Sequence, residues 1–251
     1  MKANFNTMKA KFLLSSLLAL SLIVPVVSFS QTPAPKVGQF CDRVSEIESK
    51  VEKRIADYQT KLEEKRQERL KRIETWRRER ENRLRENREK WDANRKEHFE
   101  KLRAKAQNDI QRQAVEKFIQ TVESAISVRR SKIDSAILTF KEAVDKAIAD
   151  RQAAINSAIT EYKNSIHSAF EKAKSDCASG VDSETVRENL LSSLKAAREK
   201  LKEDIRKIEK LGDVIRAEAE KKRAEIRSAI DEFKAVVEKA REELKSAFQG
   251  Q

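Results

Sequence analysis

The chain has 251 residues, of which 38% are charged and 6% aromatic, and its formal net charge is +12 at pH 7. All three prolines lie within the first 35 residues and only four glycines are present, so most of the chain lacks the residues that interrupt helices. The composition disfavours β-hairpin proteins, because it offers no Asn-Gly or Asp-Gly turn, and it favours long helices of the coiled-coil type.

Residues 1–30 have the layout of a secretory signal peptide. Three lysines precede the apolar residues 12–27, and Ser28-Phe29-Ser30 places small residues where a signal peptidase cuts, before Gln31. The apolar stretch is shorter than the ~20 residues that span a bilayer, so cleavage is favoured over the alternative of an uncleaved anchor. The sequence therefore predicts export from the cell. The mature chain would carry a net charge of +9.

Residues 31–39 (QTPAPKVGQ) are predicted to be a flexible leader, and residues 40–249 a single elongated coiled-coil domain. The first predicted helix spans about 41–107. Its apolar residues keep an eleven-residue spacing: Val44, Val51, Ile55, Leu62, Ile73, Leu84 and Phe99. Between residues 63 and 101, oppositely charged residues four apart add about 0.2–0.5 kcal/mol each to helix stability.

The second predicted helix, about 110–178, contains four copies of an eleven-residue repeat, and the first copy begins at Ser124. Its large apolar residues follow one another in alternating steps of seven and four: Ile126, Ile133, Ile137, Val144, Ile148, Ile155, Ile159, Ile166 and Phe170. Eleven residues in three turns is close to the period of an undistorted helix, so this apolar stripe stays on one face. The pattern predicts lengthwise packing against another helix.

Two places along the chain are predicted to be turns. Ser179-Gly180-Val181-Asp182 is typical of a helix end followed by a new start, with Asp182 or Ser183 as the N-cap, and Asn108-Asp109 is a weaker signal. The third predicted helix spans about 183–248. A continuous helix is favoured there over a break at Gly212-Asp213.

The three predicted helices have nearly equal lengths. They therefore favour an all-α, up-down-up antiparallel rod in which each helix is ~100 Å long. The alternative is one continuous helix through residue 109. That residue is the midpoint between Cys41 and Cys177, so a hairpin at 108–109 would bring the two cysteines together.

Cys41 and Cys177 are the only cysteines, and an exported chain meets oxidising conditions. We predict a disulfide between them. The alternatives are disulfides between chains and, for Cys177, a role as a small core residue in the apolar stripe.

Residues that would support catalysis are missing from the sequence. It has no phosphate-binding loop, dinucleotide-binding fingerprint, zinc-protease motif, nucleophile elbow or calcium-binding loop. The acids alternate with bases along helix faces rather than gathering in a concave site. Neither His98 nor His167 has another histidine or a cysteine at ligand spacing. We predict no enzyme activity, cofactor, metal or small-molecule substrate.

The basic charge is concentrated in the first helix, where residues 41–107 sum to +6. A candidate polyanion contact is the local peak formed by Arg69, Lys71, Arg72, Trp76, Arg77, Arg78 and Arg80. The competing interpretation is a solvated charged helix whose tryptophans face the seam between helices. Arg129 and Arg151 replace aromatic residues in the repeat, and their stems are expected to cover a seam edge while their charged ends stay in water.

The mature chain has several distinctive features in order: Phe40-Cys41 soon after the signal, an Arg/Glu-rich helix, Trp91-Asp92 before Glu97-His98-Phe99, an alanine-rich eleven-residue repeat and Ser175-Asp176-Cys177-Ala178. With these motifs the chain resembles a group of uncharacterised exported helical proteins from candidate-phylum bacteria. The resemblance implies a helical protein that a bacterium exports to the periplasm, medium or cell surface, and it implies no activity. A looser likeness is to the Skp-type periplasmic chaperones, whose β core has no counterpart in this sequence.

The sequence favours a structural or protein-interaction element of the cell envelope or surface, with protein partners or self-association. The alternative is a holdase-like chaperone or a binder of anionic polymers through the basic first helix. Binding to a membrane surface is disfavoured, because the apolar stripe is narrow and has few bulky residues.

Overall fold

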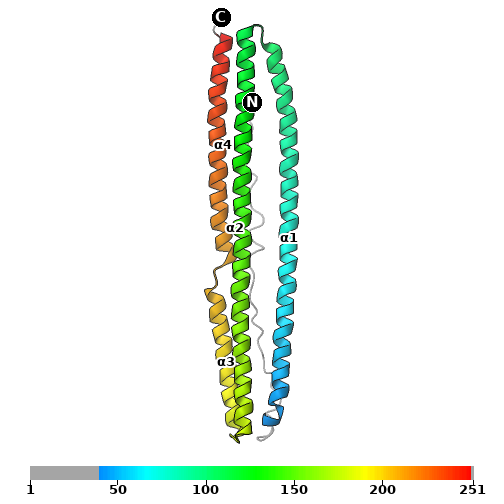
Figure 1. Cartoon of the computed structure of the whole chain (residues 1–251), viewed down its shortest axis with the longest axis vertical. Helices are drawn as coiled ribbons and strands as arrows, with labels where there is room; N and C mark the ends of the chain where they lie inside the picture. Colours follow the sequence, from blue (N-terminus) through cyan, green and yellow to red (C-terminus); the bar gives the residue numbers. More distant parts are fainter. Residues whose placement is uncertain (1–39, 250–251) are drawn as a thin grey trace. The chain divides into compact units, whose positions relative to one another are not determined.

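A computed structural model describes residues 40–249; the predicted signal peptide and leader lie outside the described residues. The described chain forms four helices: α1 (Phe40–Lys105), α2 (Asp109–Ala178), α3 (Ser183–Lys207) and α4 (Leu211–Gln249) (Figure 1). Residues 40–249 include no strand, which confirms the all-α prediction. None of the described helices combines the length and the apolar character needed to cross a membrane.

The turn between α1 and α2 is closed by side chains on both sides. The Asn108 side chain accepts the N–H of Gln111 at 2.9 Å, and the Gln111 side chain accepts the N–H of Gln107 at 2.8 Å. The first bond caps an N–H group that the start of α2 leaves without a helical partner, and the second ties the preceding residue of the turn to the same helix. The helical hairpin predicted at 108–109 is therefore confirmed, in place of the continuous helix.

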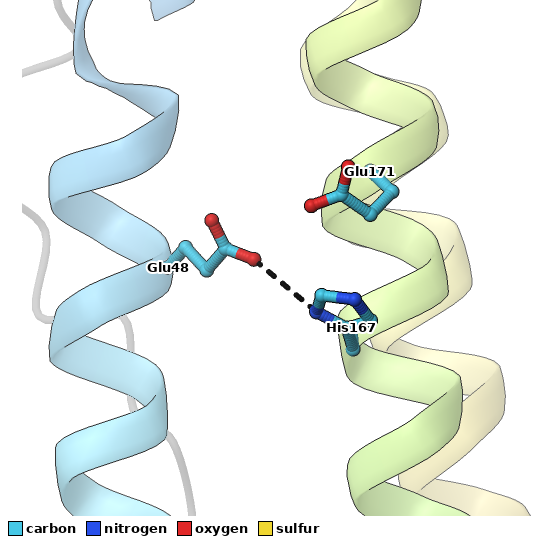
Figure 2. A group of neighbouring side chains, drawn as sticks. All are labelled: Glu48, His167 and Glu171. Atoms are coloured by element: carbon cyan, nitrogen blue, oxygen red, sulfur yellow. Dashed lines mark ion pairs between the residues drawn. The ribbon is translucent and has the colours of Figure 1, made fainter.

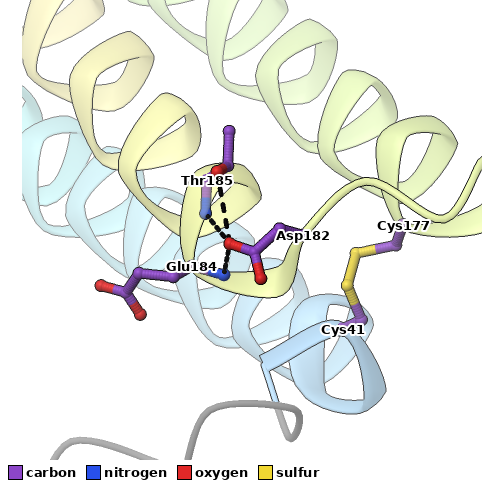
Figure 3. Close-up of a disulfide and its surroundings, with 5 residues drawn as sticks. All are labelled: Cys41, Cys177, Asp182, Glu184 and Thr185. Atoms are coloured by element: carbon purple, nitrogen blue, oxygen red, sulfur yellow. Dashed lines mark hydrogen bonds between the residues drawn. A yellow bond between two sulfur atoms is a disulfide. The ribbon is translucent and has the colours of Figure 1, made fainter.

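The turn between α2 and α3 follows from Gly180 and Asp182. Gly180 has φ +78°, a left-handed conformation that glycine adopts without strain. The N–H of Gly180 donates to the Cys177 carbonyl and that of Val181 to the Asp176 carbonyl, which closes α2 with a Schellman motif. The Asp182 carboxylate then accepts the N–H groups of Glu184 and Thr185 (Figure 3), so the predicted N-cap is confirmed.

Removing the Asp182 cap is expected to weaken the start of α3. Asp182→Ala leaves two N–H groups without their acceptor, and we expect the thermal midpoint to fall by about 2–4 °C. Asp182→Asn keeps a cap acceptor and should stay close to the wild type. Thermal melts followed by circular dichroism compare the two variants. Equal midpoints for Asp182→Ala and the wild type would show that the cap is dispensable.

The predicted intramolecular disulfide is present between Cys41 and Cys177. Their Cα atoms are 5.7 Å apart, and the bond joins the first turn of α1 to the last turn of α2 (Figure 3). The bond confirms that the two helices run antiparallel at this end.

The third helical segment is broken, and the prediction of a continuous helix was wrong. The interruption at residues 208–210 separates α3 from α4 and precedes Gly212 rather than falling on it. Ile208 takes an extended conformation with ψ 125°, and its N–H turns back to the Ile205 carbonyl. The Arg151 guanidinium donates to the Glu209 carbonyl at 2.6 Å, so a carbonyl that the break frees regains a partner.

The helices divide into two compact units, and α1 and α2 contribute to both. The first unit comprises residues 40–63 and 147–215 of the described chain. Its core combines apolar residues of α1, α2 and α3, and Phe170 and Val186 have no exposed surface. The apolar stripe predicted for α2 is buried or half-buried throughout. The core residues of α3 had not been predicted: Val186, Leu190, Ala197 and Leu201.

The second unit comprises residues 64–146 and 216–249. Its apolar core gathers where Phe99 of α1 meets α2 and the C-terminal half of α4: Phe99, Val115, Ile119, Val122 and Ile126, flanked by Phe233, Val237, Leu244 and Phe248. Over residues 64–98, α1 contributes no fully buried apolar side chain, and Ile73 and Leu84 are half-buried. Polar contacts must therefore position α1 against α2 over this stretch.

Candidate interaction surface on helix α1

Two Arg–Asp pairs set the register of α1 against α2 in the second unit. Arg77 donates to both oxygens of Asp145 at 2.7 and 3.1 Å, and Arg88 donates to both oxygens of Asp134 at 2.6 and 2.9 Å. The arginine side chains are only 21% and 23% exposed. The partners are eleven residues apart on both helices, and each aspartate closes one copy of the repeat. Bidentate pairs are geometrically specific, so this repeat fixes a register as well as a core.

In a third cross-helix pair, the acid lies on α1 and the arginine on α2. Asp92 of α1 accepts hydrogen bonds from Arg130 of α2 and from Arg95 on its own helix. The hydrogen bond from Arg130 is the main cause that lowers the pKa of Asp92 from 3.8 to about 2. The carboxylate is therefore held in its charged form between two guanidinium groups.

We expect the contribution of Asp92 to stability to depend on pH in the acid range. Because its folded pKa is depressed, this contribution is complete above about pH 4 and is lost as the pH falls toward 2. Arg130→Gln should raise the pKa of Asp92 toward 3.8. Carboxyl carbon shifts followed by NMR titration report the midpoint directly. An Asp92 midpoint near 3.8 in the wild type, or one that Arg130→Gln leaves unmoved, would contradict the pairing.

The residues predicted to contact polyanions do not share one face of α1. Arg77 is committed to Asp145, and Lys71 and Arg78 point to the side opposite Arg69. The four remaining residues share a face at helical spacing: Arg69, Arg72, Trp76 and Arg80. The structure thus divides the predicted contact between three sides of the helix.

The shared face extends along most of α1 within the second unit. Three columns of the eleven-residue phase make up this surface, without Leu102, which packs against the apolar core. We name it the basic stripe: Lys65, Arg69, Arg72, Trp76, Arg80, Arg83, Asn87, Trp91, Asn94, His98 and Lys105. Arg69 is half-buried and the other members are exposed. The stripe has six lysines and arginines and no acid, whereas residues 64–105 as a whole include ten acids.

Both tryptophans of the chain belong to the basic stripe. Trp76 is 40% exposed and Trp91 is 58% exposed. The Arg80 guanidinium lies 5.4 Å from the ring centre of Trp76, within range of a cation–π contact. The interpretation that the tryptophans face the helix seam was therefore wrong. Charged side chains at positions such as Arg77 and Arg88 fill the seam, and the indoles are left at the surface.

Cations crowd one another around the basic stripe. Burial is the main cause that lowers the pKa of Arg69, and the neighbouring charge of Arg72 lowers it further. Burial likewise lowers the pKa of Lys222 on α4, with the charge of Arg80 as the next cause. The Lys222 ammonium lies 3.7 Å from the ring centre of Phe140. Like charges at this density produce a positive potential that favours an anion nearby.

A partial counterweight lies beside the basic stripe. Glu68 pairs with Arg72 at 3.8 Å and is exposed. Glu97 pairs with Lys101, which lies just outside the stripe. Such exposed pairs contribute little binding energy and are easily exchanged for other partners. They reduce the positive potential at one edge of the stripe and leave Lys65, Arg80 and Arg83 within it.

Arg129 and Arg151 behave only in part as predicted. The Arg129 guanidinium lies 4.0 Å from the ring centre of Phe233, and burial lowers its pKa. Its charged end is therefore packed against α4 rather than left in water. The Arg151 guanidinium donates a hydrogen bond to the Glu209 carbonyl at the break between α3 and α4.

The charge and the exposed apolar residues are distributed unequally between the two units. The described residues of the first unit carry 17 basic and 18 acidic side chains, and those of the second carry 33 and 24. Of the eight exposed large apolar residues in the described chain, only Val181 belongs to the first unit. The second unit is thus both the basic unit and the one with exposed apolar contacts.

Comparison of the chain with protein-family models, curated proteins and solved structures found no match. The functional assignment rests on the residues themselves.

A second polar cluster lies in the first unit, near the disulfide. Glu48 of α1 faces His167 and Glu171 of α2, and one ligand atom from each lies within 4.8 Å of the others (Figure 2). The Lys174 ammonium contacts Glu48 at 3.0 Å and also pairs with Glu171. These bonds raise the pKa of Lys174, with the hydrogen bond to Glu171 as the main cause. Lys174 thus already pairs with both carboxylates that a metal ion would need.

Sequence reasoning missed this cluster because it considered only spacing to other histidines and cysteines. Residues four apart share a helix face, which joins His167 to Glu171. The Cys41–Cys177 pairing places Glu48 opposite the same stretch of α2. The predicted disulfide therefore implied an alignment of α1 with α2 from which the cluster of Glu48, His167 and Glu171 could have been found.

Proposed function

We propose that this chain is a non-enzymatic, exported helical element of the cell envelope or surface, which holds a fixed surface toward protein partners or further copies of itself. The observation that carries the proposal is the register of α1 on α2. Bidentate Arg–Asp pairs lie eleven residues apart along the seam, whereas a purely apolar seam would let the two helices slide past each other. Such pairs keep the exposed side chains of α1 and α2 at fixed positions relative to one another, as a binding surface requires.

The remaining architecture supports the same proposal. The disulfide at Cys41–Cys177 ties α1 to α2, and the turns after α1 and after α2 are closed by side-chain or glycine caps. The disulfide suits the oxidising conditions that an exported chain meets. The exposed apolar residues Leu138 and Val236 offer contacts for a partner on α2 and α4.

Site-specific photocrosslinking in the producing cell tests this proposal. A photoreactive amino acid at Leu138 or Val236 should yield discrete protein adducts in the envelope or secreted fraction, and the adducts should recur between preparations. The same probe at Val115, which is buried, should yield none. Retention of the chain in the cytoplasm with an intact N-terminus, or an absence of protein adducts at both exposed sites, would contradict the proposal.

A second candidate is a holdase-like chaperone or a binder of anionic polymers acting through the first helix. The specific observation in its favour is the basic stripe, with two exposed tryptophans on a face without acids. Suppression of the aggregation of an unfolded client by the purified mature chain would favour the chaperone. Salt-sensitive retention on an anionic polymer without client protection would favour the polymer binder.

A further inference from the structure

We propose that the basic stripe of α1 binds a linear acidic polysaccharide, a polymer of sugars that bear carboxylates. The proposal deepens the second candidate function and rests on the export that the leading function assumes. It concerns the second unit alone, because all members of the stripe lie between residues 65 and 105 of α1.

The first argument is charge complementarity over a long, continuous face. From Lys65 to His98, consecutive members of the stripe are three or four residues apart, so they follow one side of the helix for ~50 Å. The stripe contains no acid that would compete with an anionic ligand for its cations. Five of the six cations lie between Lys65 and Arg83, so a flexible polyanion lying along this part of the stripe would meet closely spaced cations. Guanidinium groups pair well with carboxylates.

The second argument concerns the uncharged members of the stripe. Trp76 and Trp91 offer exposed indole surface, and the apolar face of a sugar ring packs on such a surface. Asn87 and Asn94 are exposed, and each amide both donates and accepts hydrogen bonds, as sugar hydroxyls require. A face that mixes cations, indoles and amides is suited to a polymer with both charges and hydroxyls.

The spacing of the tryptophans favours a polysaccharide over a single-stranded nucleic acid. The two indoles are fifteen residues apart in one helix, which corresponds to ~22 Å. Proteins that bind single strands place aromatic rings so that successive bases stack on them. Two isolated rings at this separation do not provide such a platform, and export separates the chain from most nucleic acid in the cell.

Binding of the oxidised mature chain to immobilised polygalacturonate tests the proposal. Fully methyl-esterified polygalacturonate keeps the sugar rings and loses the carboxylates, so it serves as the matched control polymer. We expect salt-sensitive binding to the acidic form and no binding to the ester. Single-stranded oligothymidylate provides the nucleic-acid arm, and we expect it to bind more weakly than the acidic polysaccharide at equal charge concentration.

Two triple variants with the same loss of charge identify the face. Lys65→Gln, Arg80→Gln and Arg83→Gln together remove three cations of the stripe, and we expect affinity to fall by about tenfold or more. Lys71→Gln, Arg78→Gln and Lys96→Gln remove three exposed cations from the opposite side of the same helix, and affinity should stay within about twofold. All six changes keep good helix formers, which circular dichroism checks.

Several outcomes would overturn the proposal. They are no binding by the wild type, equal binding to the esterified polymer, equal losses in the two triple variants, or tighter binding to oligothymidylate. If one of these results is found for a chain that is exported and forms protein adducts, only the polysaccharide site is rejected. If the chain stays in the cytoplasm, the leading function is rejected, whatever the chain binds in solution.

Discussion

Replacing Cys41 and Cys177 by serine is expected to lower the free energy of unfolding by ~4–5 kcal/mol in the chain-entropy model. The bond closes a loop of 136 residues, which includes the whole α1–α2 hairpin. Without it, the unfolded chain regains the freedom to separate the two ends of that hairpin. Urea denaturation of the oxidised wild type and of the double variant, followed by circular dichroism, measures the difference.

The reduced wild type is the control for this experiment, because it keeps both side chains. It should unfold at nearly the same urea concentration as the double serine variant. A loss of less than about 1 kcal/mol in both samples would mean that the unfolded state already holds the two ends together, or that the native bond is strained.

Phe170→Ala is the second large expected effect, at about 3–5 kcal/mol. Phe170 has no exposed surface and belongs to the core that α1, α2 and α3 form in the first unit. Truncation leaves a cavity that long helices cannot readily collapse, since their backbones are tied by the disulfide and by the turn at Gly180. Urea unfolding, followed by circular dichroism, reports the change.

Phe170→Leu provides the matched comparison. It keeps most of the apolar volume, so it should cost less than ~1.5 kcal/mol. If the alanine and leucine variants unfold together with the wild type, Phe170 is not a core residue and the packing of the first unit is different from the one described.

Much of the fold was predictable because its signals are local or periodic. The steps of seven and four in α2 have only one compatible helix face, and Gly180 followed by Asp182 encodes a helix end and a new start. The disulfide followed from the near-equal lengths of the first two helices. The break at residues 208–210 could not be read in the same way, because no proline marks it and its exposed carbonyl is satisfied by Arg151 from another helix.

The candidate surface was only half predictable for a related physical reason. A run of basic residues in the sequence does not say which of them cross to a neighbouring helix, and Arg77 does so because Asp145 lies opposite it. The tryptophans were misplaced because apolar residues are expected in a seam, whereas arginines occupy this one. Reading α1 in its eleven-residue phase separates the seam column of Arg77 and Arg88 from the basic stripe.

The antiparallel register of the helices in one chain is the central claim, and zero-length cross-linking tests it most directly. A carbodiimide joins a lysine to a carboxylate only where the two are in contact. In an equal mixture of unlabelled and 15N-labelled chains, mass spectrometry should find intrachain links at Glu48–Lys174, Glu161–Lys200, Glu232–Lys132 and Glu243–Lys117. Links that join these lysines to acids of the neighbouring helix a turn or more away from the named partners, or links that occur only between chains, would contradict the register.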